Sequence, residues 1–197
     1  MNEKTAQFSL RGLFQPRDLT EGTPWKTILA FALPIIISYL LQQVYTISDA
    51  AIVGQTLTAG EVAGVNDTTS IIFIFLQFAF GVSAGFCVVT AAEVGAHHEA
   101  GVRRSLAAQI LLSAALTVLL TGLALLLLKP MLAWINVTPE SPEVYRAAHT
   151  YCAIIFAGIG AQLFYNFICS FLRSMGDSVT PLLFLLFSTI LNIGLDL

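Results

Sequence analysis

Long apolar stretches separated by short polar segments run along the whole chain. About twenty apolar residues in an α-helix rise about 30 Å, the thickness of the hydrocarbon core of a bilayer. Such stretches therefore predict transmembrane helices, and they occur here at residues 25–53, 66–92, 106–128, 149–172 and 181–197. The fifth is too short for a complete span and is expected to be cut off by the end of the chain. The pattern predicts an all-α, polytopic transmembrane bundle.

Polar side chains inside these stretches fall on narrow helical faces. In hydrocarbon a polar side chain costs free energy unless it faces protein or water, so these faces mark the inside of the bundle. Spacings of three and four residues keep the positions within one sector of a helix. The first span carries Tyr39, Gln42, Thr46 and Asp49, the fourth carries Gln162 and Asn166, and the fifth carries Ser188, Asn192 and Asp196. We expect these three faces to converge on one polar cavity.

Two acids, Asp49 and Asp196, lie at depth within predicted spans. A carboxylate at the bilayer centre costs about 3 kcal/mol or more unless it is neutralised or solvated, so it marks a functional site by default. The alternative is a structural acid that is protonated and bonded to a neighbour, or one that lies near the outer interface. We predict that the two carboxylates lie within about 10 Å of each other, with Asn192 beside them. Asn166 should line the same cavity, although its amide can equally bond a neighbouring helix.

Three further features of the spans predict packing and movement. The third span repeats Gln109, Ser113, Thr117 and Thr121, small or uncharged polar residues of the kind that hold membrane helices together. The second span contains the G-x-x-x-G motif Gly81–Gly85, which predicts close approach of another backbone. Pro34 in the first span removes a helical hydrogen bond and predicts a bend or hinge there.

Composition agrees with a membrane protein. Hydrophobic residues make up 56% of the chain and charged residues 11%, and the mean hydropathy is +0.81. Soluble domains are about 25% charged. Seven basic residues fall on one side of the predicted spans, at Lys4, Arg11, Arg17, Lys26, Arg103, Arg104 and Arg173, and two on the other, at Lys129 and Arg146. By the positive-inside rule, residues 1–24 form a cytoplasmic tail and the N-terminus is cytoplasmic.

The sequence offers little for catalysis. It has no phosphate-binding loop, no H-E-x-x-H motif and no run of carboxylates suited to magnesium. We therefore expect no enzyme activity, no catalytic residues and no structural metal site. Neither a cofactor nor a nucleic-acid partner is expected. The three cysteines all lie in apolar runs and are interpreted as free buried thiols.

Four motifs, in order along the chain, resemble the multidrug and toxic compound extrusion (MATE) transporters. The first span of that family is similar to LPIIISYLLQQVYTISDAAIVG, and the end of its second span to GVSAGFCVVTAAEVGA. The connection between its fourth and fifth spans is similar to FLRSMGDSVTP, and its fifth span to LNIGLDL. The resemblance covers nearly the whole chain from Pro24 onward. It implies that residues 25–197 are part of the first six-helix lobe of a twelve-helix, two-lobed transporter whose C-terminal lobe is missing here.

The resemblance also implies a function. MATE proteins lie in the membrane, expected here to be the plasma membrane, and export amphipathic, often cationic drug-like compounds in exchange for H⁺ or Na⁺. In similar members the first-lobe site for the cation or proton uses positions that correspond to Asp49, Asn192 and Asp196. The N-x-x-x-D pair is intact in this sequence, while the choice of coupling ion stays open.

Two other functions stay open at the level of the sequence. A lipid-linked oligosaccharide flippase of the same broad superfamily should carry cationic residues in its cavity to bind a pyrophosphate, and the polar faces here have none. A membrane-embedded transferase should carry paired metal-binding carboxylates, and none is found. Both features favour the antiporter.

Overall fold

The fold is helical throughout the part of the chain that the structure describes. The computed structural model describes residues 19–20 and 22–196, without the side chain of Asp196, so most of the predicted tail at residues 1–24 lies outside it. The described helices are α2 (Pro24–Thr56), α3 (Ala59–Gly95), α4 (Glu99–Leu126), α5 (Leu128–Trp134), α6 (Pro142–Ala157), α7 (Ile159–Ser174) and α8 (Val179–Asp196).

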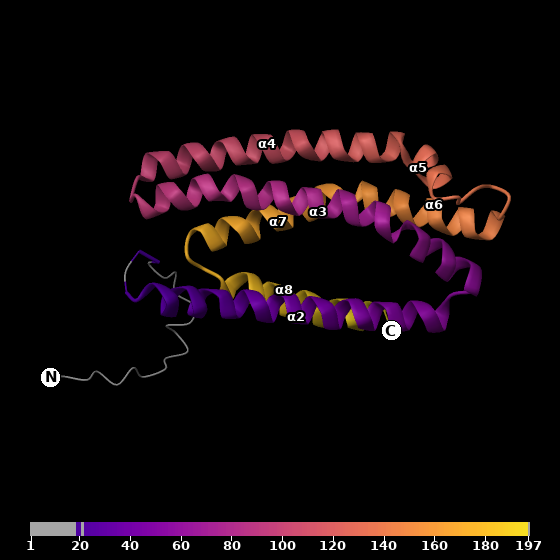
Figure 1. Cartoon of the computed structure of the whole chain (residues 1–197), viewed down its shortest axis with the longest axis horizontal. Coiled ribbons are helices and arrows are strands. Elements are labelled where there is room, and N and C mark those ends of the chain that lie inside the picture. Colours follow the sequence, from indigo (N-terminus) through magenta and orange to yellow (C-terminus); the bar gives the residue numbers. More distant parts are fainter. Residues whose placement is uncertain (1–18, 21, 197) are drawn as a thin grey trace.

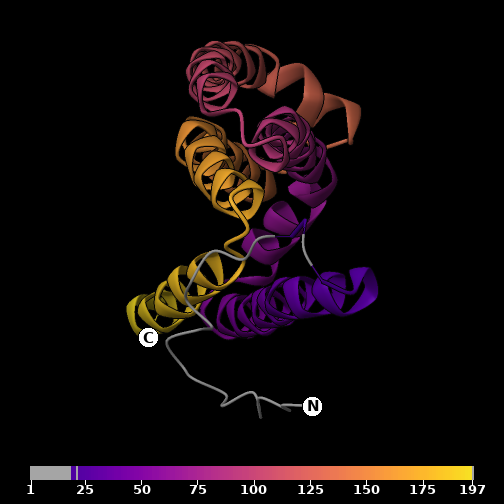
Figure 2. The same cartoon turned by 90° about the vertical axis from the view of Figure 1, so that its left-hand side faces the viewer.

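The helices form two layers (Figure 1). In the first layer, α3 packs against α4, α6 and α7, and the short α5 lies beside α6. In the second layer, α2 packs along α8. Figure 2 shows α2 and α8 side by side and set apart from the other helices. The two layers are connected through the turn before α3 and the turn after α7, so the space between them is the natural place for a site.

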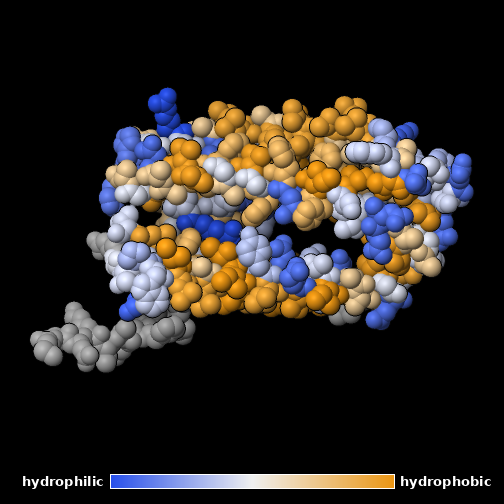
Figure 3. Space-filling model, in the orientation of Figure 1, coloured by the Kyte–Doolittle hydropathy of each residue, from blue (hydrophilic) through white to orange (hydrophobic). Residues whose placement is uncertain are grey.

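The core lies in the first layer. It is formed by buried apolar side chains of α3, α4, α5, α6 and α7, including Leu132, Phe156 and Leu163. The rings of Phe75 and Phe156 join α3 to α6, with centroids 5.0 Å apart. Large apolar residues elsewhere are exposed along the sides of the bundle, while polar residues gather at its ends and around the hollow between the layers (Figure 3). A molecule with this surface belongs in lipid.

By length and composition, α2, α3 and α4 are each able to cross a membrane. The pair α6 and α7 also qualifies if it is taken as one span bent by 44°. The apolar helix that follows, α8, is shorter. The five predicted stretches thus all fall on helices, and the fourth differs from its prediction because it is broken.

The break lies at Gly158, between α6 and α7. The amide of Gly158 donates to the carbonyls of Ile154 and Ile155, which closes α6 with a tight turn. Two residues later Gly160 faces α4, where an added Cβ would lie 2.9 Å from a methyl carbon of Thr117. Glycine at position 160 therefore allows the close packing, and a hydropathy pattern detects neither this contact nor the turn at Gly158.

The helix that carries the second predicted span begins before that span. Helix α3 starts at Ala59 rather than Asn66, because Thr58 and Glu61 form a capping box at its N-terminus. The Thr58 hydroxyl also lies 2.6 Å from a carboxylate oxygen of Glu143, at the start of α6. The requirement for about twenty apolar residues identifies only the apolar part of a helix. The capping residues determine where the helix begins.

The prediction of close packing at Gly81 and Gly85 is wrong for the described chain. No atom lies within 4 Å of a Cβ built at either glycine. Close packing occurs instead near the other end of α3. There a Cβ on Gly64 would lie 2.6 Å from the carbonyl oxygen of Val144, and one on Gly60 would lie 2.6 Å from the carboxylate carbon of Glu143. Gly60 and Gly64 thus let α3 approach α6.

The polar stripe of α4 packs against its neighbours, as the sequence predicts. Gln109 is buried and donates to the carbonyl of Phe86 at 3.0 Å and to Ser105 at 2.9 Å. It also bonds Thr90, and its side-chain oxygen accepts from the Cys87 thiol at 3.2 Å. These bonds join α3 to α4. They also satisfy the buried amide of Gln109, and a buried polar group without a partner would cost about 1–3 kcal/mol.

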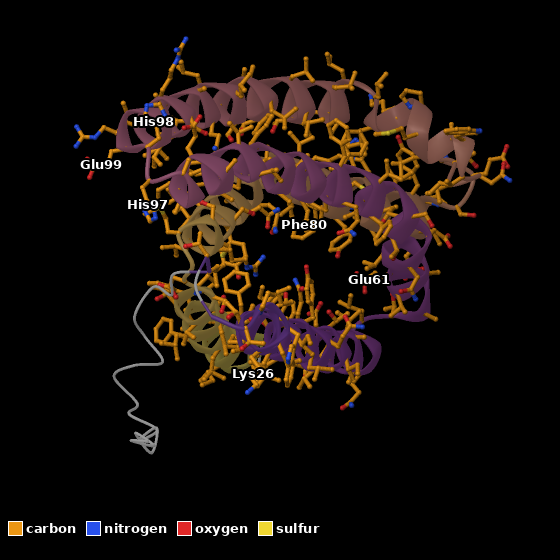
Figure 4. All side chains as sticks on the ribbon, turned by 60° about the vertical axis from the view of Figure 1, so that its left-hand side comes forward. Lys26, Glu61, Phe80, His97, His98 and Glu99 are labelled. Carbon is orange, nitrogen blue, oxygen red and sulfur yellow. The ribbon has the colours of Figure 1, made fainter. Side chains whose placement is uncertain are left out.

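The ends of the bundle differ in charge. The start of α2, the turn between α3 and α4, and the end of α7 lie at one end (Figure 1). That end carries the basic residues Lys26, Arg103, Arg104 and Arg173. Figure 4 shows His97, His98 and Glu99 together at the turn between α3 and α4, and Glu61 near the opposite end of α3. These four residues all belong to the group of seven basic residues that the sequence assigns to one side of the membrane.

Candidate functional site

A cavity of about 230 Å³ lies where α2, α7 and α8 meet. Its lining is mostly polar and uncharged, which is unusual among helices whose outer surfaces are apolar. The lining residues are Gln42 and Tyr45 of α2, Gln162 and Tyr165 of α7, and Leu185, Ser188, Thr189 and Asn192 of α8. Helices far apart in the sequence therefore contribute to one polar pocket.

Four of the residues singled out in the sequence line this cavity. They come from all three predicted faces and are Gln42, Gln162, Ser188 and Asn192. Four others are not among its lining residues, and they are Tyr39, Thr46, Asp49 and Asn166, of which Asn166 was expected to line the same cavity. Tyr39 is 48% exposed, and the Thr46 hydroxyl donates to the Gln42 carbonyl of its own helix at 2.9 Å. The helical period thus identifies the inward-facing side of each helix. Tyr39, the first residue of the polar face of α2, lies beyond the cavity.

Two amides of α7 act as a pair. The Gln162 side chain donates to the Asn166 side-chain oxygen at 3.2 Å, and Asn166 itself is buried. Within the described residues, the amide nitrogen of Asn166 and the side-chain oxygen of Asn192 are buried without a partner. Buried polar atoms are normally bonded, so unpartnered ones beside a polar cavity indicate a place for a ligand or for water.

Asp49 is partly buried in the second half of α2, two turns beyond Gln42. It interacts electrostatically with Tyr151 of α6, a helix of the other layer. This interaction crosses the space between the two layers. The side chain of Asp196 lies outside the described residues, so the predicted distance between the two carboxylates stays a prediction.

A second, wider pocket of about 850 Å³ lies between α3 and α6. Tyr151 forms part of its wall, and Glu61 and Arg146 line it nearer to the ends of their helices. Because Tyr151 also interacts with Asp49, this pocket leads from the end of the bundle toward the acid.

Reasoning from the sequence missed Tyr45, Tyr151 and Thr189. Tyr45 lies three residues after Gln42 and four before Asp49, so its place on the same face was available from the spacing. Thr189 is buried and follows Ser188 in the chain, but it is not part of the polar spacing pattern that the sequence analysis used for α8. Tyr151 precedes the break at Gly158, and its approach to Asp49 depends on packing between layers that no local pattern encodes.

Pro34, the predicted hinge, lies inside a helix that continues without interruption from Pro24 to Thr56. The Ser38 hydroxyl donates to the Pro34 carbonyl at 2.9 Å, and both residues are buried. A side chain that bonds the carbonyl four residues back often accompanies a bend. Movement at this position stays a prediction.

Comparison with known proteins identifies the chain. The MatE family model matches residues 34–197. The chain belongs to the MATE family. It is 30% identical over 181 residues to the probable multidrug resistance protein YpnP of Bacillus subtilis (strain 168), an alignment that covers 89% of this chain and 39% of that protein.

Solved structures show the same fold. A MOP superfamily transporter from Pyrococcus furiosus matches with a TM-score of 0.83 and 24% identity, over 91% of this chain and 39% of that one. A MATE structure described as a bent conformation matches with a TM-score of 0.79 and 25% identity, over 90% of this chain and 39% of that one. The chain thus spans about two fifths of the length of its MATE relatives. It is an integral membrane protein of that family.

Proposed function

We propose that this MATE chain forms most of the first lobe of a twelve-helix, two-lobed antiporter. The complete protein would export amphipathic, often cationic drug-like compounds in exchange for H⁺ or Na⁺. The single observation that supports this most is the polar cavity among α2, α7 and α8 inside an otherwise apolar bundle, with the partly buried Asp49 on the same helix as Gln42. No cofactor is needed for such exchange, since the ion gradient supplies the free energy.

In this proposal Asp49, Asn192 and Asp196 bind the coupling cation or proton. Carboxylate and amide oxygens are ligands that hard cations prefer, and two neighbouring carboxylates at depth favour a bound proton or cation between them. The unpartnered side-chain oxygen of Asn192 supports this role. Gln42, Gln162, Asn166 and Ser188 would supply neutral hydrogen bonds in the adjoining cavity, with Tyr39 and Thr46 at its margin.

The wide pocket beside α6 is proposed as the route to Asp49 from the outer side. Its acid Glu61 attracts cations, and Tyr151 lies between the pocket and Asp49. The basic end of the bundle would face the cytoplasm, with the N-terminus inside. The membrane in this proposal is the plasma membrane. Pro34 would act as the hinge that lets α2 bend as the ion binds.

A flippase for lipid-linked oligosaccharides fits less well. Its substrate carries a pyrophosphate, which requires cationic side chains in the central site. None of the residues that line the α2, α7 and α8 cavity is basic. The site therefore suits a cation better than an anion.

The proposal is tested by dye efflux from vesicles that hold the transporter with both of its lobes. Under an imposed H⁺ or Na⁺ gradient, Asp49→Asn should reduce efflux of a cationic dye about tenfold or more, because it removes a charged ligand at depth. The matched control is Asp67→Asn, which neutralises an exposed acid of α3 that lines neither described pocket. Unchanged gradient-driven efflux in Asp49→Asn would show that the assignment is wrong.

A further inference from the structure

The chain has two tryptophans, and they lie at opposite ends of the bundle. Trp25 is in the first turn of α2, and Trp134 is the last residue of α5. Figure 1 shows the start of α2 at one end of the long axis and α5 near the other. Both rings are exposed, Trp25 by 62% and Trp134 by 88%. Such large aromatic surfaces are not left in water without a reason.

Each tryptophan marks a change in the exposed surface. After Trp25, α2 exposes Ile28, Leu29 and Leu33 along its side. Before Trp134, the end of α4 exposes Leu123, Leu125 and Leu126, and after it the exposed residues are polar, among them Asn136 and Glu140. Both rings therefore lie where a lipid-facing surface meets a polar one, which is where the amphipathic indole is most stable in a bilayer.

A lysine lies at the Trp25 ring, and another lies on the helix that ends at Trp134. The ammonium of Lys26 lies 5.5 Å from the centroid of the Trp25 ring. Lys129 is exposed on α5, whose Leu128 and Leu132 are buried in the core. Cations at this level match the anionic phosphates of the lipid headgroups, and their alkyl chains can extend toward the interface.

The length of α4 agrees with this placement. From Arg104 to Leu126 it rises about 33 Å, at 1.5 Å per residue. That is close to the hydrocarbon thickness of about 30 Å, so Arg104 and α5 reach opposite headgroup regions.

We infer that Trp25 with Lys26, and Trp134 with Lys129, bind the headgroup regions of opposite leaflets. Each layer of the molecule then has its own anchor. Trp25 fixes the end of α2, the helix that carries Asp49, in one leaflet. Trp134 fixes the α3–α7 layer in the other, with α5 lying along the interface.

Two variants, Trp25→Phe and Trp134→Phe, each leave a single fluorescent tryptophan in the full chain. In vesicles of phosphatidylcholine and phosphatidylglycerol, bromines near the ester end of the acyl chains should quench each one about twofold more than bromines near the chain middle. In vesicles sorted to one orientation, a membrane-impermeant quencher outside should reach one tryptophan and not the other.

Stronger quenching by the deep bromines, quenching by neither lipid, or access to both rings from one side would overturn the inference. Trp25→Tyr and Trp134→Tyr keep an aromatic ring suited to the interface and replace any phenylalanine variant whose circular dichroism shows lost helix.

Discussion

At the scale of residues, the stability of the Asp49 carboxylate depends on the side chains around it. Its carboxylate lies in an apolar bundle and interacts with Tyr151 across the space between the layers. A hydroxyl dipole that turns toward a carboxylate can stabilise the ion at depth, where fewer water molecules are present to do so. The phenol therefore belongs to the machinery proposed for ion coupling, although it is not on the helices that carry the predicted ligands.

We predict that Tyr151→Phe weakens coupling without unfolding the chain. Loss of the hydroxyl should raise the ion concentration for half-maximal efflux about fivefold, which corresponds to roughly 1 kcal/mol. The matched control is Tyr145→Phe in the same helix, where Tyr145 packs against His149 with ring centroids 5.9 Å apart. Equal ion dependence in Tyr151→Phe and the unmodified transporter would remove Tyr151 from the site.

At the scale of helices, contact between α3 and α6 depends on small residues at one position. An added Cβ at Gly64 would lie 2.6 Å from the Val144 carbonyl oxygen, so the backbones must separate. Gly81 lies on the same helix in open space, where alanine gains helix propensity of about 1 kcal/mol. The two glycines are therefore a matched pair.

We predict that Gly64→Ala destabilises the chain by about 1–3 kcal/mol, the usual cost of overpacking. Gly81→Ala should be neutral or stabilising. Thermal unfolding in detergent, followed by circular dichroism, measures both. If the two variants melt at the same temperature, the close approach of α3 to α6 is not a source of stability.

The helical elements also show what the sequence could predict. Polar side chains three and four residues apart identified inward faces, and Gln42, Gln162, Ser188 and Asn192 do share a cavity. Periodicity identified these four because hydrocarbon penalises polar groups on a lipid-facing side, but it also selected Tyr39 and Thr46, which lie outside the cavity. The glycines were not predictable in this way, since Gly64 and Gly81 differ only in what lies opposite them. The break at Gly158 and the position of Tyr151 likewise depend on packing between elements.

At the scale of the whole molecule, two layers enclose the candidate site. The α2 and α8 layer packs mainly within itself, and the α3–α7 layer holds the core (Figure 2). A site between two separately packed layers can open and close as they move, which alternating access requires. The central claim is that the polar faces of α2 and α8 bring Asp49 and Asp196 into one ion-binding site.

Intramolecular cross-linking tests this claim most directly. In a chain whose native cysteines are replaced by serine, Asp49→Cys and Asp196→Cys should be joined by a bifunctional maleimide about 10 Å long, the separation expected for a shared site. Cleavage between α5 and α6 then leaves the two pieces linked on a denaturing gel. The control pair is Glu93→Cys with Asp196→Cys, since Glu93 lies at the far end of α3. We predict linkage for the first pair and none for the control, and a folded chain in which the first pair stays unlinked would contradict the shared site.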